Sequence, residues 1–197
     1  MQCNTRIFMV RENLRDIPRY GLPRGYSFRT YRPGDEDVWA AIHQDAEPLI
    51  DVDRRTFERN FGYDRDALPE RCFFLVDPAG RDVGTGTAWY EESFRDGDYG
   101  RVHWICILRE WQGRGLAKPL MTHVMDTLAR WHDRAYLTTS AGRPPAVNLY
   151  LGFGFRPCIQ SDEQRRAWEY LAGKLAHPAL DEYRAPVQGD LGPSLPD

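Results

Sequence analysis

The sequence predicts an α/β fold with a mixed central sheet, and three observations support this prediction. Segments with strand-like and helix-like patterns alternate along the 197 residues. The first half contains a hairpin signal, typical of antiparallel pairing, and the second half contains a strand–helix–strand signal, typical of parallel pairing. Apolar residues make up 42% of the chain and charged residues 28%, an ordinary balance for one globular domain with its own core.

The first half begins with an arginine-rich stretch, residues 1–25, which Pro18 and Pro23 interrupt. We expect an irregular arm there, packed on a domain that spans residues 26–177. After the arm, the predicted elements are a strand over 26–31, helices over 33–44 and 51–62, and hairpin strands over 71–76 and 83–90 joined by the turn DPAGR.

The second half alternates strands and helices up to a tail over residues 178–197 that is rich in Pro and Gly and predicted to be irregular. The predicted elements are a strand over 102–108, a long helix over 115–134, a strand over 135–140, a helix over 144–154, a strand over 155–159 and a helix over 162–176. Trp168 and Leu171 form the expected buried side of this extra C-terminal helix, which we expect to close the open side of the sheet.

Composition excludes several classes of protein. The net charge of −3 and the pI of about 6.0 argue against a nucleic-acid partner held by bulk positive charge. No apolar run approaches the roughly 20 residues of a membrane span, and the first residues resemble no signal peptide. The cysteines are scattered, at Cys3, Cys72, Cys106 and Cys158, without a CxxC pair. We therefore expect a cytoplasmic protein with free thiols and no membrane partner.

The stretch Gln112–Ala117, QGRGLA, lies between a predicted strand and a predicted helix. Gly113 and Gly115 have no side chains, so a ligand can approach the backbone closely. Their N–H groups and the positive end of the helix dipole suit an anion, and Arg114 adds a permanent charge. The two glycines alone favour a tight turn that needs glycine only for its geometry and binds nothing.

Other anion-binding and catalytic motifs are missing from the sequence. The Walker pattern is absent, Lys118 stands where a dinucleotide fingerprint needs its third glycine, and no G-x-S-x-G segment occurs. The five histidines lack zinc spacing, since His123 and His132 are nine residues apart, so we expect no metal.

Two segments resemble a known family. QGRGLA is similar to the [R/Q]-x-x-G-x-[G/A] signature of the GNAT superfamily of acyl-CoA N-acyltransferases, and AVNLYLGFGF, residues 146–155, is similar to its A-x-x-L-Y-x-x-x-G-F segment. The resemblance covers about residues 24–160, with the two segments in the expected order. It implies a three-layer GNAT-like fold, with helices on both faces of the sheet and with splayed fourth and fifth strands.

The resemblance also implies an acetyl-CoA site. The pantetheine arm would bind the backbone of the fourth strand, and the pyrophosphate would bind the glycine turn. The implied cofactor-binding residues are Ile105, Cys106, Ile107, Gln112, Gly113, Arg114, Gly115, Leu116, Ala117 and Tyr150. Tyr150 matches the family tyrosine that lies near the sulfur and acts as an acid, although it also suits plain packing of the helix on the sheet.

The base remains open between alternatives. Strand alternation predicts that His103, Ile105 and Ile107 share one face, and a histidine at this place resembles the base of the arylalkylamine branch. Glu91 and Glu92 are rival bases that would act through water. The sequence departs from the family at Arg143, where many members have an Asn that contacts the pantetheine arm.

These features predict an N-acetyltransferase that moves an acetyl group from acetyl-CoA to a primary amine by direct attack in a ternary complex. The alternative is a non-catalytic acyl-CoA-binding or regulatory module of the same fold. Acidic residues in the first two helices and in the loop after the hairpin suit a cationic acceptor, a small molecule or a peptide amine, although a solvated surface explains most of them. A homodimer is left open.

Overall fold

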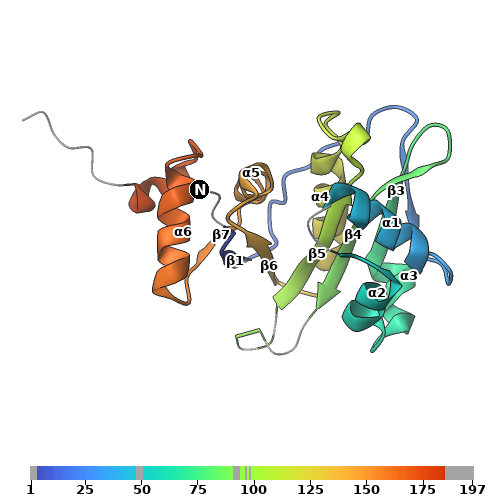
Figure 1. The fold of residues 1–197 in the computed structure, drawn as a ribbon, viewed down its shortest axis with the longest axis horizontal. Coiled ribbons are helices and arrows are strands. Elements are labelled where there is room, and N and C mark those ends of the chain that lie inside the picture. The colour runs from blue at the N-terminus through green and yellow to red at the C-terminus, as the bar shows by residue number, and fades with distance from the viewer. Residues whose placement is uncertain (1–3, 48–50, 91–93, 96, 98, 185–197) are drawn as a thin grey trace, which may run out of the picture.

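The fold is a seven-stranded mixed sheet with helices on both faces, in the strand order β2-β3-β4-β5-β6-β1-β7 (Figure 1). The computed structural model describes residues 4–47, 51–90, 94–95, 97 and 99–184. The strands are β1 (Arg6–Arg11), β2 (Ser27–Thr30), β3 (Cys72–Val76), β4 (Asp82–Tyr90), β5 (Tyr99–Ile107), β6 (Arg134–Ser140) and β7 (Arg156–Cys158). The predicted mixed sheet is confirmed.

Five of the helices lie where the sequence patterns predicted them, with differences at their ends, whereas α3 was not predicted. They are α1 (Glu36–Ala46), α2 (Arg54–Phe61), α3 (Leu68–Arg71), α4 (Ala117–Leu128), α5 (Pro144–Gly152) and α6 (Asp162–Ala172). Short 3-10 turns occupy Arg65–Ala67, Arg109–Trp111 and Pro178–Tyr183. The last of these turns corrects the expected irregular tail over its first residues, whereas residues 185–197 lie outside the described part of the chain.

Caps fix two helix starts. Asp53 precedes α2, where its carboxylate accepts from Thr56 N at 2.7 Å and the Thr56 hydroxyl accepts from Asp53 N at 3.4 Å. Ser161 caps α6 by accepting from Gln164 N at 3.3 Å. On α6, Trp168 and Leu171 are fully buried, as predicted. Among the described helices, none is long and apolar enough to cross a membrane.

The two faces of the sheet bury separate cores. One core, between the sheet and α4 and α5, contains Leu120, Val124 and Leu151. The other, beneath α1 and α2, is aromatic and is built around Trp39, Phe57, Phe61, Phe74 and Trp89 (Figure 1). Side chains on opposite faces of β5 therefore reach different surroundings, which matters for the site below.

The predicted irregular arm is wrong for its first part, because β1 is an inner strand of the sheet. It pairs antiparallel with β6, with Phe8 opposite Thr138, and antiparallel with β7, with Phe8 opposite Cys158. Its Ile7 and Met9 are fully buried. The segment RIFMVR is a short apolar run of the kind that a strand between two neighbours needs, and the arginines at its ends obscured it.

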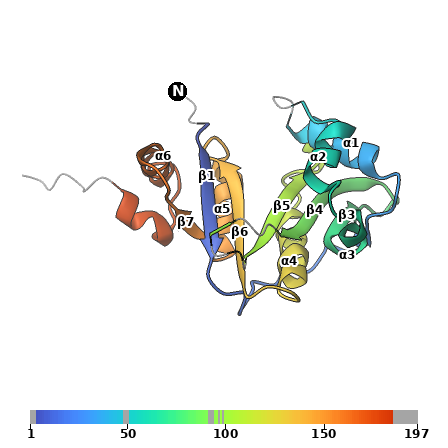
Figure 2. The ribbon, with the colours of Figure 1, turned by 90° about the horizontal axis from the view of Figure 1, so that it is seen from below.

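The predicted fourth and fifth strands are β5 and β6, because β1 adds one to the count. Their parallel pairing is limited to three residues on each strand, with Tyr99–Arg101 of β5 opposite Arg134–Tyr136 of β6. Beyond that point the strands separate, and Figure 2 shows β6 with β1 and β5 with β4 as the two arms of a V. The expected splay is confirmed, and it opens the sheet at the carboxyl end of β5.

Candidate active site

A groove of about 720 Å³ begins where β5 and β6 separate. Its walls come from the end of β5, the turn that follows it, the start of α4 and one side of α5. Nine of the ten predicted cofactor-binding residues line it: Ile105, Cys106, Ile107, Gln112, Gly113, Gly115, Leu116, Ala117 and Tyr150. Asn148, Tyr20 and His177 line it as well. Parts of the chain up to 157 positions apart thus meet in one cavity.

The glycine turn leaves its backbone open toward the groove. Gly113 and Gly115 have φ values of 76° and 77°, in the left-handed region that favours glycine. A Cβ added at either glycine would meet no atom within 4 Å, so close protein packing does not explain their lack of a side chain. Gln112 Nε2 donates to Ile107 O at 2.9 Å and ties the turn to β5.

Arg114 is the predicted cofactor residue that does not line the groove. Its guanidinium lies over the Trp111 ring, 4.3 Å from the centroid, and donates to Glu110 O at 2.9 Å. These contacts hold the guanidinium of Arg114 against Trp111, away from the lining of the groove. Its part in phosphate binding stays a prediction.

A β-bulge in β5 overturns the predicted face of His103. Thr85 lies opposite Cys106 and Thr87 lies opposite His103, so β5 has one residue more than β4 over this interval. Trp104 takes a φ of 48°, which is unusual for a bulky side chain. As a result His103 and Trp104 both face the aromatic core under α1 and α2, whereas Ile105 packs in the core with α4.

The His103 imidazole is enclosed and does not line the groove. It is 9% exposed, its Nε2 lies 3.2 Å from Asn60 Oδ1, and it contacts the rings of Phe61 and Trp104. Burial, and then the charge of Arg101, hold the pKa of His103 well below its usual value, so the ring is neutral at pH 7. The structure therefore does not bring His103 and Tyr150 into one cavity.

Tyr150 lies on α5 with its ring partly buried beside Phe155. Burial raises the pKa of Tyr150 to about 12, Cys106 and Glu47 add to the effect, and Arg143 opposes it. The hydroxyl is therefore protonated at neutral pH. Within the described part of the chain it has no hydrogen-bond partner, which leaves it free to donate to a ligand in the groove.

Comparison with known proteins identifies the family. Residues 37–155, more than half of the chain, match the Acetyltransferase (GNAT) family. The chain belongs to the GNAT family. The matched region runs from α1 to the end of the segment AVNLYLGFGF and contains both motifs that suggested this fold. Strand β1, the segment after it and α6 lie outside the match.

The GNAT relatives include curated proteins and solved structures. A mycothiol acetyltransferase of Pseudarthrobacter chlorophenolicus is 32% identical over 152 residues, which are 71% of this chain and 45% of that protein. One of Streptomyces bingchenggensis is 33% identical over 71% of this chain and 46% of its own length. This chain thus spans about half the length of these relatives. A GCN5-related N-acetyltransferase of Sphaerobacter thermophilus shares the fold, with a TM-score of 0.64 and 24% identity over 80% of this chain and 50% of that one.

Against this GNAT framework, an ion pair beside Tyr150 is a feature that sequence reasoning missed. Glu47, at the C-terminal end of α1, lies 2.9 Å from Arg143, the residue before α5. Both charges influence the pKa values of Tyr150 and Cys106, although neither Glu47 nor Arg143 lines the groove itself. The sequence marked Arg143 as a departure from the family but held no signal for its partner, 96 positions away.

Other candidate groups are set apart from the groove or lie outside the description. Glu91 and Glu92, the rival bases, fall outside the described residues. His43 is buried between Trp39 and Trp104, and burial lowers its pKa to about 3. In residues 4–184, apart from the gaps named above, no cluster of three or more His, Cys, Asp or Glu is placed to hold a metal ion.

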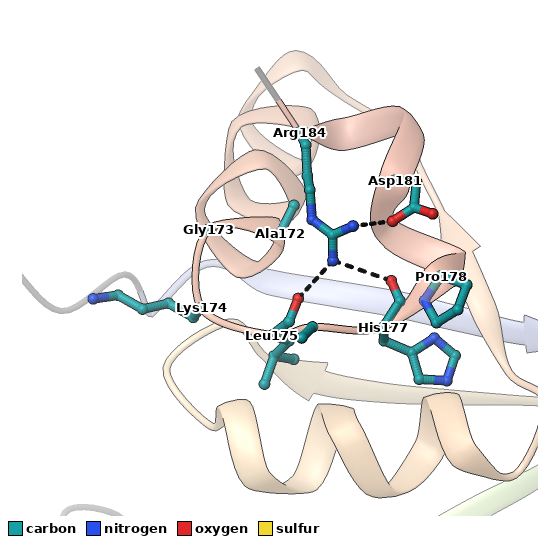
Figure 3. Close-up of a pocket in the computed structure, with 9 residues that line it drawn as sticks. Ala172, Gly173, Lys174, Leu175, His177, Pro178, Asp181 and Arg184 are labelled. Atoms are coloured by element: carbon teal, nitrogen blue, oxygen red, sulfur yellow. Dashed lines mark hydrogen bonds and ion pairs between the residues drawn. The ribbon is translucent and has the colours of Figure 1, made fainter. Parts of the chain in front are cut away.

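A second hollow, of about 430 Å³, lies between the end of α6 and the turn Pro178–Tyr183 (Figure 3). There Arg184 pairs with Asp181 and donates to Leu175 O at 3.0 Å and His177 O at 3.4 Å. None of the predicted site residues lines it. The contacts of Arg184 fix the loop that carries His177, a residue that also lines the groove between β5 and β6.

Proposed function

We propose that this chain transfers the acetyl group of acetyl-CoA to the amine of a small molecule, by direct attack within a ternary complex. The observation that supports this most is the groove between β5 and β6, where the end of β5, the glycine turn and Tyr150 meet. Family membership makes acetyl-CoA the expected donor. The sequence, structure and comparisons thus favour the same chemistry.

The groove fits the donor on three counts. Beyond Arg101, the edge of β5 that faces β6 has no strand partner, so its N–H and C=O groups can pair with the amides of a pantetheine arm. The open backbone at Gly113 and Gly115 and the start of α4 suit a pyrophosphate. The apolar side chains of Ile105, Leu116 and Leu149 suit the alkyl parts of the arm. Acetyl-CoA bound there supplies the thioester carbonyl that an amine attacks.

Tyr150 is the proposed acid. Its hydroxyl keeps its proton at neutral pH, lines the groove and has no competing partner among the described residues. A thiolate leaving group requires a proton, and a positioned phenol can supply it. Tyr150 Oη can thus donate its proton to the sulfur of coenzyme A as that sulfur leaves.

Among the described residues the base has two candidates, and Glu91 and Glu92 stay predictions outside them. An alkylamine is mostly protonated at pH 7 and must lose a proton before it attacks. His103 is neutral but enclosed, so it would act only through Asn60 and an added relay. Glu47 is about one-third exposed and its charge acts on Tyr150, but it pairs with Arg143 and does not line the groove, so it would have to leave that pair to take a proton. We propose Glu47 as the first candidate and His103 as the second.

The acceptor is proposed as a small primary amine. Glu47 and Asp45 place two carboxylates at the end of α1, close to the end of β5, where Asp45 accepts from Arg109 N at 2.8 Å. Arg143 and Arg109 pair with these carboxylates, so the proposal of a small amine rests on the relatives and not on net charge at this end. The relatives are named mycothiol acetyltransferases, so the acceptor of those enzymes is the first amine to test.

The test is to detect acetylated product by mass spectrometry after incubation with acetyl-CoA. The amines are the acceptor of the mycothiol acetyltransferases, simple alkylamines, amino acids and a peptide with a free N-terminus. We expect acetylation of a small-molecule amine. Binding of acetyl-CoA without product from any of these amines would favour the non-catalytic acyl-CoA-binding module instead.

A further inference from the structure

Two residues that line the groove lie outside the matched family region. Tyr20 comes from the segment between β1 and β2, and His177 comes from the loop after α6. Lys118, in the first turn of α4 immediately after the glycine turn, lines the groove as well and contacts Tyr20. A group attached to an anion on the glycine turn would therefore share the groove with these three side chains.

Tyr20 is held in place while much of its ring stays exposed. Its backbone N–H donates to Thr122 Oγ1 at 3.2 Å, and that hydroxyl donates to Pro18 O at 3.1 Å, so one side chain of α4 fixes the segment at two points. Arg19 adds an ion pair to Asp126 at 2.7 Å. The ring packs 5.7 Å from Phe153 and is 40% exposed, so it offers a flat face at a fixed position.

Lys118 is a cation that the fold itself does not neutralise. Its Nζ lies 4.9 Å from the centroid of the Tyr20 ring, and within the described residues no carboxylate pairs with it. A positive charge in the first turn of a helix is disfavoured by the helix dipole. An anionic ligand would remove both disadvantages at once.

His177 brings a hydrogen-bond donor to the same groove. Its Nδ1 accepts from Ala179 N at 3.2 Å, so the neutral ring carries its proton on Nε2. Figure 3 shows the imidazole turned away from Arg184, whose guanidinium holds the backbone of the loop. His177 is one of the residues that line the groove.

We propose that Tyr20, Lys118 and His177 form the subsite for the 3′-phosphorylated adenosine end of coenzyme A. Tyr20 offers the face on which adenine stacks, Lys118 pairs with the 3′-phosphate, and His177 Nε2 donates a hydrogen bond to the ribose phosphate. The subsite rests on the proposed function, because it assumes that the pyrophosphate binds the glycine turn. It gives the segment after β1 and the loop after α6 a role in donor recognition.

The test is a calorimetric titration of the full chain with three ligands: coenzyme A, dephospho-coenzyme A, which lacks the 3′-phosphate, and 4′-phosphopantetheine, which lacks the adenosine. Lys118→Met should weaken binding of coenzyme A about 5-fold and leave that of dephospho-coenzyme A unchanged. Tyr20→Leu should weaken both about 10-fold and leave that of phosphopantetheine unchanged. His177→Ala should weaken binding of coenzyme A about 3-fold.

Lys174→Met is the matched control. The chain has only two lysines, and Lys174 also lies over a tyrosine, 5.8 Å from the Tyr170 ring, but it lines the second hollow and not the groove. It should leave the affinity for all three ligands unchanged.

Two outcomes would overturn the subsite. One is equal affinity of the unaltered chain for coenzyme A and dephospho-coenzyme A, and the other is an equal loss for all three ligands in Lys118→Met, which would place Lys118 on the pyrophosphate. Both leave the proposed function intact. Failure to bind coenzyme A at all would reject the proposed function as well.

Discussion

Tyr150 gives the most direct prediction at the scale of single residues. Tyr150→Phe removes the proton that would reach the leaving sulfur but keeps the ring that packs beside Phe155. We expect kcat to fall about 100-fold, because a positioned acid contributes 10²–10⁴-fold, with little change in KM for acetyl-CoA. Steady-state kinetics measures both constants. Unchanged kcat would remove Tyr150 from the chemistry.

The choice of base is a second question at this scale. Glu47→Gln should lower kcat/KM about 100-fold if its carboxylate takes the amine proton. Asp37→Asn is the matched control, since Asp37 is an exposed acid on the same helix that also pairs with an arginine, Arg54. Full activity of Glu47→Gln, together with a large loss in His103→Asn, would reverse the order of the two candidates.

A third residue-scale prediction concerns stability and pH. Burial lowers the pKa of His43 to about 3, against about 6.5 in the unfolded chain, so only the unfolded state binds this proton between those values. Stability should therefore be lost as the pH falls below about 6.5. Between pH 7 and pH 5, His43 should account for about 1–2 kcal/mol of the loss in the free energy of unfolding.

Urea unfolding at pH 7 and pH 5, of the unaltered chain and of His43→Phe, measures this contribution. The substitution keeps an aromatic ring between Trp39 and Trp104. The carboxyl of Glu36, whose pKa is lowered to about 2, loses its contribution only below about pH 4.5 and does not enter this window. An equal pH dependence in both proteins would contradict the account.

At the scale of elements, the glycine turn separates backbone strain from ligand binding. Gly113→Ala places a Cβ in open space beside the groove, at a φ of 76°. Gly80→Ala, in the turn between β3 and β4, has a φ of 84° and equally open space but no groove beside it. Both should cost about 1 kcal/mol of stability, because alanine disfavours this conformation.

Only Gly113→Ala should raise the KM for acetyl-CoA, by about 10-fold, since its methyl group would stand between the backbone and the pyrophosphate. Thermal unfolding and initial rates check the two effects in the same pair of variants. An equal KM for acetyl-CoA in both variants would mean that the glycine turn does not bind the pyrophosphate.

The elements also show how far sequence patterns reach. The glycine turn and the segment around Tyr150 were recognised because their function depends on residue types at short fixed spacings. The bulge at Trp104 could not be predicted, because nothing in the segment VHWICI indicates that one residue breaks the alternation of the strand. The predicted face of His103 was wrong for this reason. Strand β1 was missed because its four apolar residues, between Arg6 and Arg11, give little periodicity.

At the scale of the whole molecule, β1 joins two parts of the sheet. It pairs with β6 on one side and β7 on the other, so β7 is attached to the sheet through it. Met9 is fully buried in β1, and Met9→Ala should lower the free energy of unfolding by about 2–4 kcal/mol. Val38→Ala, at an exposed position of α1, should cost less than about 0.5 kcal/mol.

Urea denaturation of the two variants measures the difference. A loss in Met9→Ala as small as that in Val38→Ala would show that β1 contributes little to the sheet.

The groove as a whole also marks the limit of prediction from sequence. Its family residues were found by motif, but Tyr20 and His177, which also line it, and Glu47, whose charge acts on Tyr150, come from segments without one. Their roles depend on contacts across more than 90 positions, such as the bond from Tyr20 N to Thr122 and the pair of Glu47 with Arg143. Such contacts exist only once the sheet has formed.

The central claim is that the open end of the sheet is an acetyl-CoA site. Calorimetric titration of the purified chain with acetyl-CoA, with ATP and NAD as controls, tests it most directly. The account predicts selective binding of acetyl-CoA at one site per chain, weakened about 10-fold in Gly113→Ala and unaffected in Gly80→Ala. Absence of binding at millimolar acetyl-CoA, or equal binding of ATP, would contradict it.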